Sequence, residues 1–346
     1  MISDNMQIKS ALWCPYRLDF TFEARTSRGA MWHKDTYFIR IEDADGRVSY
    51  GEVPLFKGLS AEDNQEFESH LSDACHQASS ALHCFSGFSS ITFGFESAIA
   101  ALTPSNRWHS GEMPIYINGL IWMGNKATMK KRIREKLDAG FRVLKLKIGG
   151  INFAEEVDLL KAIRKDFAPD CLELRLDANG SFTPDNALER LEILSEYNIH
   201  SLEQPIKAGQ IEAMAKICNA SPIPIALDEE LIGCRSYDQK KELLDAIKPQ
   251  YIILKPALCG GFKAADEYID LIGPGRWWAT SALESNVGLD AIASWLSNYD
   301  LTMPQGLGTG QLYSNNILSP ICLDGMRIFY NPAYFWQSLE DLPWRE

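Results

Sequence analysis

The sequence has no paired cysteine motif, no basic run and no long apolar run, and each absence excludes a class of protein. Its eight cysteines are scattered without a C-x-x-C pair, so neither a zinc site nor a thioredoxin-type redox motif is indicated, and we expect reduced thiols. No window offers about 18 uncharged apolar residues, and the N-terminal stretch lacks the basic and apolar regions of a signal peptide. We therefore expect a cytoplasmic protein without a membrane span.

Positive charge is also scarce, because 46 acidic residues stand against 34 basic ones and the net charge is −12. Nucleic-acid binding requires clustered Lys and Arg, so a polyanionic partner is not expected. A hydrophobic fraction of 46% with 23% charged residues is ordinary for a globular protein with a filled core. The sequence leaves the oligomeric state open.

The first part of the chain, residues 1–113, is predicted to be an α+β capping domain. Residues 8–23 and 36–53 alternate as antiparallel strands, and helical spacing follows in 61–83 and 88–103. Between the strands lies a polar segment with a glycine, 26–33, which we expect to be a loop able to close over a ligand. A plain hairpin loop without substrate contact is the alternative.

The next part, residues 114–318, has the period of a (β/α) TIM-type barrel. Apolar runs end near Lys147, Asp177, Glu203, Asp228 and Lys255, at spacings of 30, 26, 25 and 27 residues. Each spacing is about one strand, one helix and two loops, and such a barrel takes about 250 residues in all. Residues 115–122 are the expected first strand, 276–285 the seventh, and the run before 306–310 the eighth.

Helices are predicted between these strands, and a C-terminal segment, 319–346, is expected to pack back on the body. Thr183 is the expected N-cap of one helix, with Pro184 at its first position. The predicted helices cover residues 125–139, 152–167, 184–197, 210–219, 236–247, 262–272 and 288–298.

Three carboxylates, Asp177, Glu203 and Asp228, follow three of the apolar runs. The carboxyl ends of parallel strands meet around one mouth of a barrel, so these acids should face each other there. All-oxygen ligation without a matching His or Cys favours Mg²⁺, for which Mn²⁺ can substitute. For any one acid taken alone, a helix N-cap or a surface group is the alternative.

Lysines accompany the acids. Lys145 and Lys147 are two apart on one run and so share one face of the predicted strand. We expect burial and mutual repulsion to lower their pKa values, as a general base requires, and Lys255 to supply a second acid/base group or a cation. An exposed strand edge is the alternative.

Together these residues resemble the enolase superfamily, specifically its muconate-lactonizing-enzyme-like subgroup. The matching motifs are K-x-K at Lys145 and Lys147, D-A-N at Asp177, E-Q-P at Glu203, D-E at Asp228, and K-P followed by Gly-Gly at Lys255. The resemblance implies a Mg²⁺ ion held by the three acids, Lys147 and Lys255 as catalytic groups, Lys145 as a supporting group, and an ene-diolate intermediate.

Within the subgroup, residues 280–295 and 305–316 are similar to the o-succinylbenzoate synthases, which are dehydrating lyases. Epimerases of the subgroup carry an acidic D-x-D at the last strand, and this chain has glycines around Thr309 instead. An N-succinylamino acid racemase or dipeptide epimerase is the alternative enzyme, and a non-catalytic barrel the alternative from another class. The expected substrate-binding residues are Arg28, Ser281, Glu284, Gly308 and Thr309.

Overall fold

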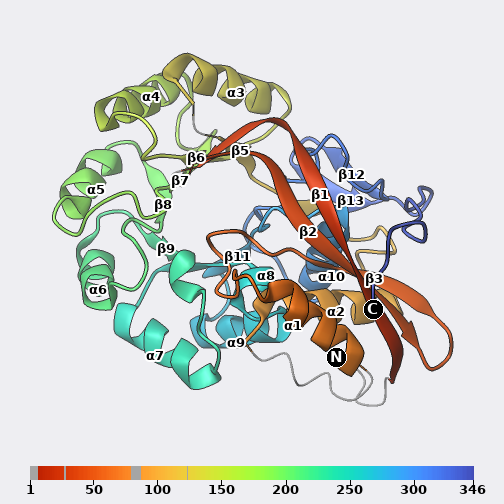
Figure 1. The fold of residues 1–346 in the computed structure, drawn as a ribbon. Helices are drawn as coiled ribbons and strands as arrows, with labels where there is room; N and C mark the ends of the chain where they lie inside the picture. The colour runs from red at the N-terminus through yellow and green to blue at the C-terminus, as the bar shows by residue number, and fades with distance from the viewer. Residues whose placement is uncertain (1–6, 27–28, 79–86, 123) are drawn as a thin grey trace.

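The computed structural model describes residues 7–26, 29–78, 87–122 and 124–346. Figure 1 shows a curled parallel sheet surrounded by helices, with a separate antiparallel sheet and two helices beside it. This is the α/β barrel with an α+β cap that the sequence predicts.

The cap is a three-stranded antiparallel sheet, in the order β1-β2-β3, covered by two helices. Its apolar core is continuous between the sheet and the helices, with Ile39, Ile41, Leu71 and Phe95 fully buried. The helices are shorter than predicted, and residues 79–83 of the first prediction lie outside the described residues. The elements are β1 (Ile8–Thr26), β2 (Gly29–Asp43), β3 (Val48–Val53), α1 (Phe67–Gln77) and α2 (Ser89–Ala101).

The prediction of an open loop at residues 26–33 is wrong. Strand β2 already begins at Gly29, and the pairs Thr26 with Gly29 and Ala24 with Met31 continue the hairpin to its end. The reason is packing, because this end of the hairpin lies on the barrel through an apolar cluster that includes Ala24, Met31 and Trp122. Arg28 lies outside the described residues.

The barrel sheet has seven parallel strands in the order β11-β10-β9-β8-β7-β6-β5. Helices cover its outer face, as Figure 1 shows for α3 to α7. The strands are β5 (Gly119–Ile121), β6 (Val143–Lys147), β7 (Glu173–Asp177), β8 (Ile199–Glu203), β9 (Ile225–Leu227), β10 (Tyr251–Leu254) and β11 (Trp277–Ala279). The helices are α3 (Lys126–Asp138), α4 (Phe153–Asp166), α5 (Ala187–Ser195), α6 (Ile211–Ala220), η1 (Glu229–Leu231), α7 (Tyr237–Ile247), α8 (Pro256–Cys259), α9 (Phe262–Ile272) and α10 (Asn286–Leu296).

Two residues, Gln305 and Gly306, close the barrel in the place of an eighth strand. The Gln305 N–H donates to the Tyr116 carbonyl at 2.8 Å, and the Gly306 N–H donates to the Ala279 carbonyl at 2.7 Å. A side chain at position 306 does not fit, because an added Cβ would lie 2.2 Å from Thr280 Oγ1. The predicted eighth strand is therefore present in position but reduced to two bridges.

One predicted helix start is also wrong. Helix α5 begins at Ala187, three residues after the expected Pro184. The Thr183 N–H donates to Asn186 Oδ1 at 3.0 Å and its carbonyl accepts from the Ala187 N–H at 3.0 Å, so residues 183–186 form a turn before the helix. A local side-chain bond of this kind competes with helical hydrogen bonding.

The C-terminal segment contacts both parts of the protein. Strands β12 (Ile321–Asp324) and β13 (Arg327–Tyr330) form a sheet with β4 (Ile115–Tyr116), the start of the barrel part. Further along, Arg345 bridges to Trp13 of the cap sheet. We keep the division into 1–113, 114–318 and 319–346 as a proposal. Among the described residues, helices are too short or too polar to cross a membrane.

Substituting Gly51 by Ala should strongly destabilise the cap. Strand β3 and helix α2 approach so closely here that an added Cβ would lie 2.0 Å from the Gly94 carbonyl oxygen and 2.9 Å from the Ala98 nitrogen. Backbone atoms cannot move aside as a side chain can, so we expect a cost of about 3 kcal/mol, the upper end of typical overpacking. Denaturant unfolding measures it. Gly308→Ala is the control, because its added Cβ meets no atom nearer than 3.5 Å, and equal stability of the two variants would contradict the prediction.

Candidate active site

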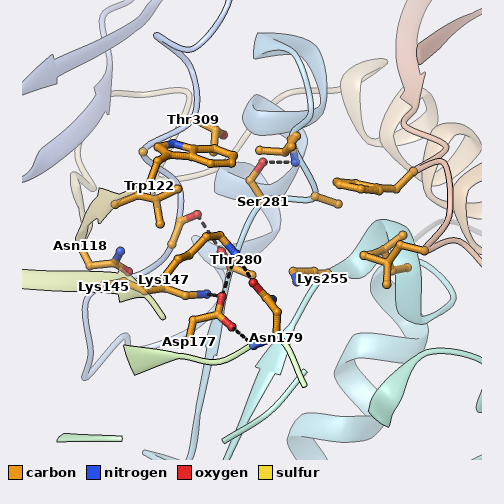
Figure 2. A pocket seen from close by; sticks show the side chains of 18 residues that line it. Asn118, Trp122, Lys145, Lys147, Asp177, Asn179, Lys255, Thr280, Ser281 and Thr309 are labelled. Atoms are coloured by element: carbon orange, nitrogen blue, oxygen red, sulfur yellow. Dashed lines mark hydrogen bonds and ion pairs between the residues drawn. The ribbon is translucent and has the colours of Figure 1, made fainter. Parts of the chain in front are cut away.

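A pocket lies at the carboxyl ends of the barrel strands and is roofed by the cap. It encloses about 710 Å³ of space, part of it open to solvent. Figure 2 shows Lys145, Lys147 and Asp177 close together in it, with Lys255, Trp122 and Ser281 around them. The lining residues are Phe56, Leu59, Asn118, Leu120, Trp122, Lys145, Lys147, Asp177, Asn179, Lys255, Leu258, Thr280, Ser281, Ala282, Leu283, Gly306, Gly308 and Thr309.

The strand register brings the predicted acids to one edge of the sheet. Lys147 pairs with Asp177, and Asp177 pairs with Glu203 on the next strand. Asp228 directly follows β9, the strand after that. All three acids are at most 2% exposed, so their charges face each other with little water between them.

The lysines are the counter-ions of these acids in the structure. Lys145 Nζ lies 3.0 Å from Asp177 Oδ2 and 2.5 Å from Glu203 Oε2. Lys147 Nζ lies 3.0 Å from the same Asp177 oxygen. Lys255, on the opposite side of the mouth, pairs with Asp228. Thus three lysines from two strand ends are paired with the three acids.

One electrostatic expectation is wrong, because the acids dominate over lysine–lysine repulsion. Burial opposes the charged form of Lys145, yet the carboxylates of Asp177 and Glu203 outweigh it and raise the pKa of Lys145. The pKa of Lys255 is raised in the same way, against burial, by Asp228 first. Conversely, Lys145 and Lys147 overcome the burial of Asp177 and lower its pKa.

The site fits a divalent cation in its donor chemistry. Burial, together with the neighbouring charge of Asp177, raises the pKa of Glu203 well above its ordinary value. Its Oε1 atom is buried without a hydrogen-bond partner. In the described part of the chain no three His, Cys, Asp or Glu side chains are gathered around one point as ligands, and Lys145 and Lys255 are paired with Glu203 and Asp228. A bound cation would give Glu203 Oε1 the partner that it lacks.

Replacing Glu203 by Gln should stabilise the metal-free protein at neutral pH. The pKa of Glu203 is higher in the folded state than in the unfolded chain, so the stability it contributes is complete at low pH and is lost as the pH rises through the raised pKa. A neutral Gln avoids that loss and also removes a carboxylate that we expect to bind the metal. We therefore expect an unfolding temperature at pH 8 in EDTA at or above that of the unmodified protein, and no further rise with Mg²⁺. A variant that Mg²⁺ still stabilises fully would contradict the ligand role.

Asn179 is a site residue that the sequence reasoning missed. Lys147 Nζ donates to Asn179 Oδ1 at 2.7 Å, and Asn179 Nδ2 donates to Glu229 Oε1 at 3.2 Å. Its backbone has φ +43°, which turns the chain sharply after β7. The signal was the D-A-N motif itself, which places an amide two residues after a strand-end acid.

The predicted substrate-binding residues divide into two groups. Ser281, Gly308 and Thr309 line the pocket, and Thr309 Oγ1 is buried without a partner. Glu284 is fully buried and is not among the pocket-lining residues described. Its Oε2 atom accepts a hydrogen bond from the Ser281 hydroxyl. The apolar wall formed by Trp122, Leu283 and their neighbours was not predicted, because apolar residues carry no distinctive motif.

Comparison with known proteins places these observations among homologues. A model of the family described as Enolase C-terminal domain-like matches residues 128–272. An o-succinylbenzoate synthase of Desulfotalea psychrophila is 44% identical, over 89% of this chain and 96% of the relative. A D-Ala-D/L-Ala epimerase of Cytophaga hutchinsonii is 28% identical over 63% of each chain.

Solved structures agree with this. The crystal structure of MenC from Desulfotalea psychrophila superposes with a TM-score of 0.80 at 38% identity, covering 94% of this chain and 99% of the other. An o-succinylbenzoate synthase of Thermosynechococcus elongatus, solved with Mg in its active site, gives a TM-score of 0.75 at 24% identity, covering 89% and 96%. At that identity the second likeness shows the fold alone.

Proposed function

Because this chain belongs to the enolase superfamily and, within it, to the o-succinylbenzoate synthases, which are carbon–oxygen lyases, we propose that it dehydrates 2-succinyl-6-hydroxy-2,4-cyclohexadiene-1-carboxylate to 2-succinylbenzoate. The observation that carries the proposal is that Lys147 and Lys255 line one pocket together with the buried carboxylate of Asp177. Both lysines and Asp177 line the same space, so one substrate can touch a base, a cation and an acid cluster.

Asp177, Glu203 and Asp228 are the residues that would hold a divalent metal, and we propose Mg²⁺. When bound, the metal supplies positive charge to the substrate carboxylate and so favours loss of the neighbouring proton. The solved relative from Thermosynechococcus elongatus holds Mg in its active site, and the unpartnered Glu203 Oε1 supports the same assignment here.

Lys147 is the proposed general base and acid. In its neutral form Nζ removes the proton α to the substrate carboxylate, and the resulting ammonium returns that proton to the departing hydroxyl. Asn179 Oδ1 accepts from Nζ at 2.7 Å and Asp177 holds it on the other side. These two bonds fix where the proton is taken and returned.

Lys255 is proposed to stabilise negative charge and to lie against the substrate ring. Its pKa is raised by Asp228 and other acids, so it stays an ammonium near neutral pH. The charge that develops on the substrate during proton removal then falls opposite a fixed cation. Lys145, held between Asp177 and Glu203, supports the floor of the site.

The test is an assay of the purified protein with the cyclohexadiene substrate, followed by absorbance of the aromatic product. Racemase or epimerase activity is the second candidate, since Lys147 and Lys255 lie on opposite sides of the pocket. Solvent deuterium exchange separates the two. A dedicated lyase leaves the α-proton of N-succinylamino acids and dipeptides unexchanged, whereas exchange without dehydration would favour the epimerase.

The pocket wall favours the lyase. Epimerases of the subgroup are expected to carry two acids at the last strand, and here that position offers Gly308 and Thr309, with Thr309 Oγ1 free to donate to an anionic carboxylate. A role in menaquinone biosynthesis and a cytoplasmic location remain predictions.

A further inference from the structure

The hydroxyl of Ser281 lines the active-site pocket but is fully engaged on its far side. Its oxygen accepts from the Leu283 N–H at 2.9 Å and from the Glu284 N–H at 3.3 Å, and its one proton is donated to Glu284 Oε2. A serine hydroxyl offers one donor and two acceptor positions. In this arrangement Ser281 therefore has no proton left for a substrate carboxylate.

Glu284, the acceptor of that proton, is a buried acid with a spare oxygen. It is 0% exposed, and its Oε1 atom has no hydrogen-bond partner. Burial raises its pKa to about 7, against the stabilising bond from Ser281 and the charge of Lys34. Both its protonated and its ionised forms are thus accessible near neutral pH.

The groups that face Glu284 come from the cap as well as from the barrel. Lys34 of β2 is buried, and its Nζ makes no hydrogen bond in the described structure. Glu52 of β3 accepts from the Ser285 N–H and Oγ and from the Gly288 N–H, which ties the cap to the start of α10. Tyr313 donates to the Leu283 carbonyl at 2.7 Å. Lys34 is the one lysine among these groups; burial lowers its pKa, and the charges of Glu52 and Glu284 oppose that shift.

We propose that Glu284, under the charge of Lys34 from the cap, is a positioning residue that decides whether the Ser281 hydroxyl donates to Glu284 or into the pocket. When Glu284 is ionised, it takes the Ser281 proton. When Glu284 is protonated, its carboxylic O–H donates to Ser281 Oγ and replaces the 3.3 Å hydrogen bond from the Glu284 backbone N–H. The Ser281 hydroxyl proton then points into the pocket. The inference deepens the proposed function, on which it rests, by assigning how the pocket recognises the second carboxylate of the substrate.

The sign of the effect follows from the donor count. Below the pKa of Glu284 the pocket gains a hydroxyl donor and loses a nearby negative charge, so an anionic ligand binds more tightly. Above it both changes reverse. A hydrogen bond to a charged group is worth enough that we expect Kd for 2-succinylbenzoate and KM for the substrate to rise roughly tenfold between about pH 6 and pH 8.5.

Three variants test the arrangement. Glu284→Gln keeps a neutral donor beside Ser281, so Kd and KM should stay near their low-pH values across the range. In Ser281→Ala, Kd and KM should stay near the values that the unmodified protein has at high pH. Lys34→Met removes the cation that favours ionised Glu284, so the midpoint of the pH dependence should move to higher pH. The part of the infrared carboxylic-acid band that disappears near pH 7 in the unmodified protein, is lost in Glu284→Gln and is kept in Glu96→Gln reports the titration of Glu284 without turnover.

Glu96→Gln is the matched control. Glu96 is also buried, its pKa is also raised to about 7 by burial, and it accepts from the Phe262 N–H away from the pocket lining. Its variant should keep the pH dependence of the unmodified enzyme.

Turnover with the same pH-dependent KM in Glu284→Gln would overturn the inference while the proposed function stands. An unshifted midpoint in Lys34→Met would overturn the role of Lys34. Absence of turnover and of product binding in the unmodified protein would instead overturn the proposed function.

Discussion

Lys147→Arg is expected to abolish dehydration. Arginine keeps the positive charge but does not lose its proton near neutral pH, so it can neither remove the substrate's α-proton nor return it. General base catalysis alone is typically worth about 10²–10⁴ in rate, and Lys147 transfers a proton twice. We therefore expect kcat to fall by at least that factor while product binding, measured by calorimetry, remains.

The variant Lys255→Arg distinguishes the role of Lys255 from that of Lys147. Its proposed role is only to stabilise charge, so an arginine there should retain part of the dehydration that Lys147→Arg loses. Lys240→Arg is the control for altering a buried lysine, since Lys240 is 1% exposed and pairs with Glu267 at 2.6 Å, outside the pocket lining. Dehydration by Lys147→Arg together with an inactive Lys255→Arg would show that the assigned roles are reversed.

Removal of divalent metal is expected to eliminate activity. Three buried carboxylates face each other at the strand ends, and Glu203 Oε1 lacks any partner. Lys145 lies between Asp177 and Glu203, within ion-pair distance of both. Activity should vanish in EDTA and return with Mg²⁺ or Mn²⁺, and thermal unfolding should shift upward on addition of either metal.

The unfolding measurement detects metal binding independently of turnover. Asp177→Asn should abolish both the activity and the Mg²⁺-dependent shift, whereas Asn179→Ala should keep the shift and lower turnover by misplacing Lys147. Full turnover in a metal-free preparation would exclude the proposed assignment of the three acids.

The sequence alone identified the residues of the floor, because local patterns carry that information. Lys145 and Lys147 must share a face since side chains alternate along a strand. Asp177, Glu203 and Asp228 recur at the period of one strand and one helix, and parallel strand ends converge whatever fills the loops. The capping sheet was also visible in the alternation of its strands.

Other features were set by interactions between distant segments, and local patterns could not show them. The segment 26–33 looks like a polar loop, yet its far end is strand because Met31 packs against the barrel wall. Helix α5 starts late because the Asn186 side chain folds back on Thr183. The D-A-N motif contains Asn179, but only the structure shows that this residue is the partner of Lys147.

The chain's own pattern thus determined which chemical groups stand at the mouth of the barrel, since strand periodicity and strand-end spacing are written in consecutive residues. Only the tertiary structure decided how those groups are paired. Lys145 bridges two acids where repulsion from Lys147 was expected, and Glu284 lies under the charge of Lys34, 250 positions earlier in the chain. Burial and the choice among competing charges depend on all the neighbours at once, and those neighbours come together only when the chain folds.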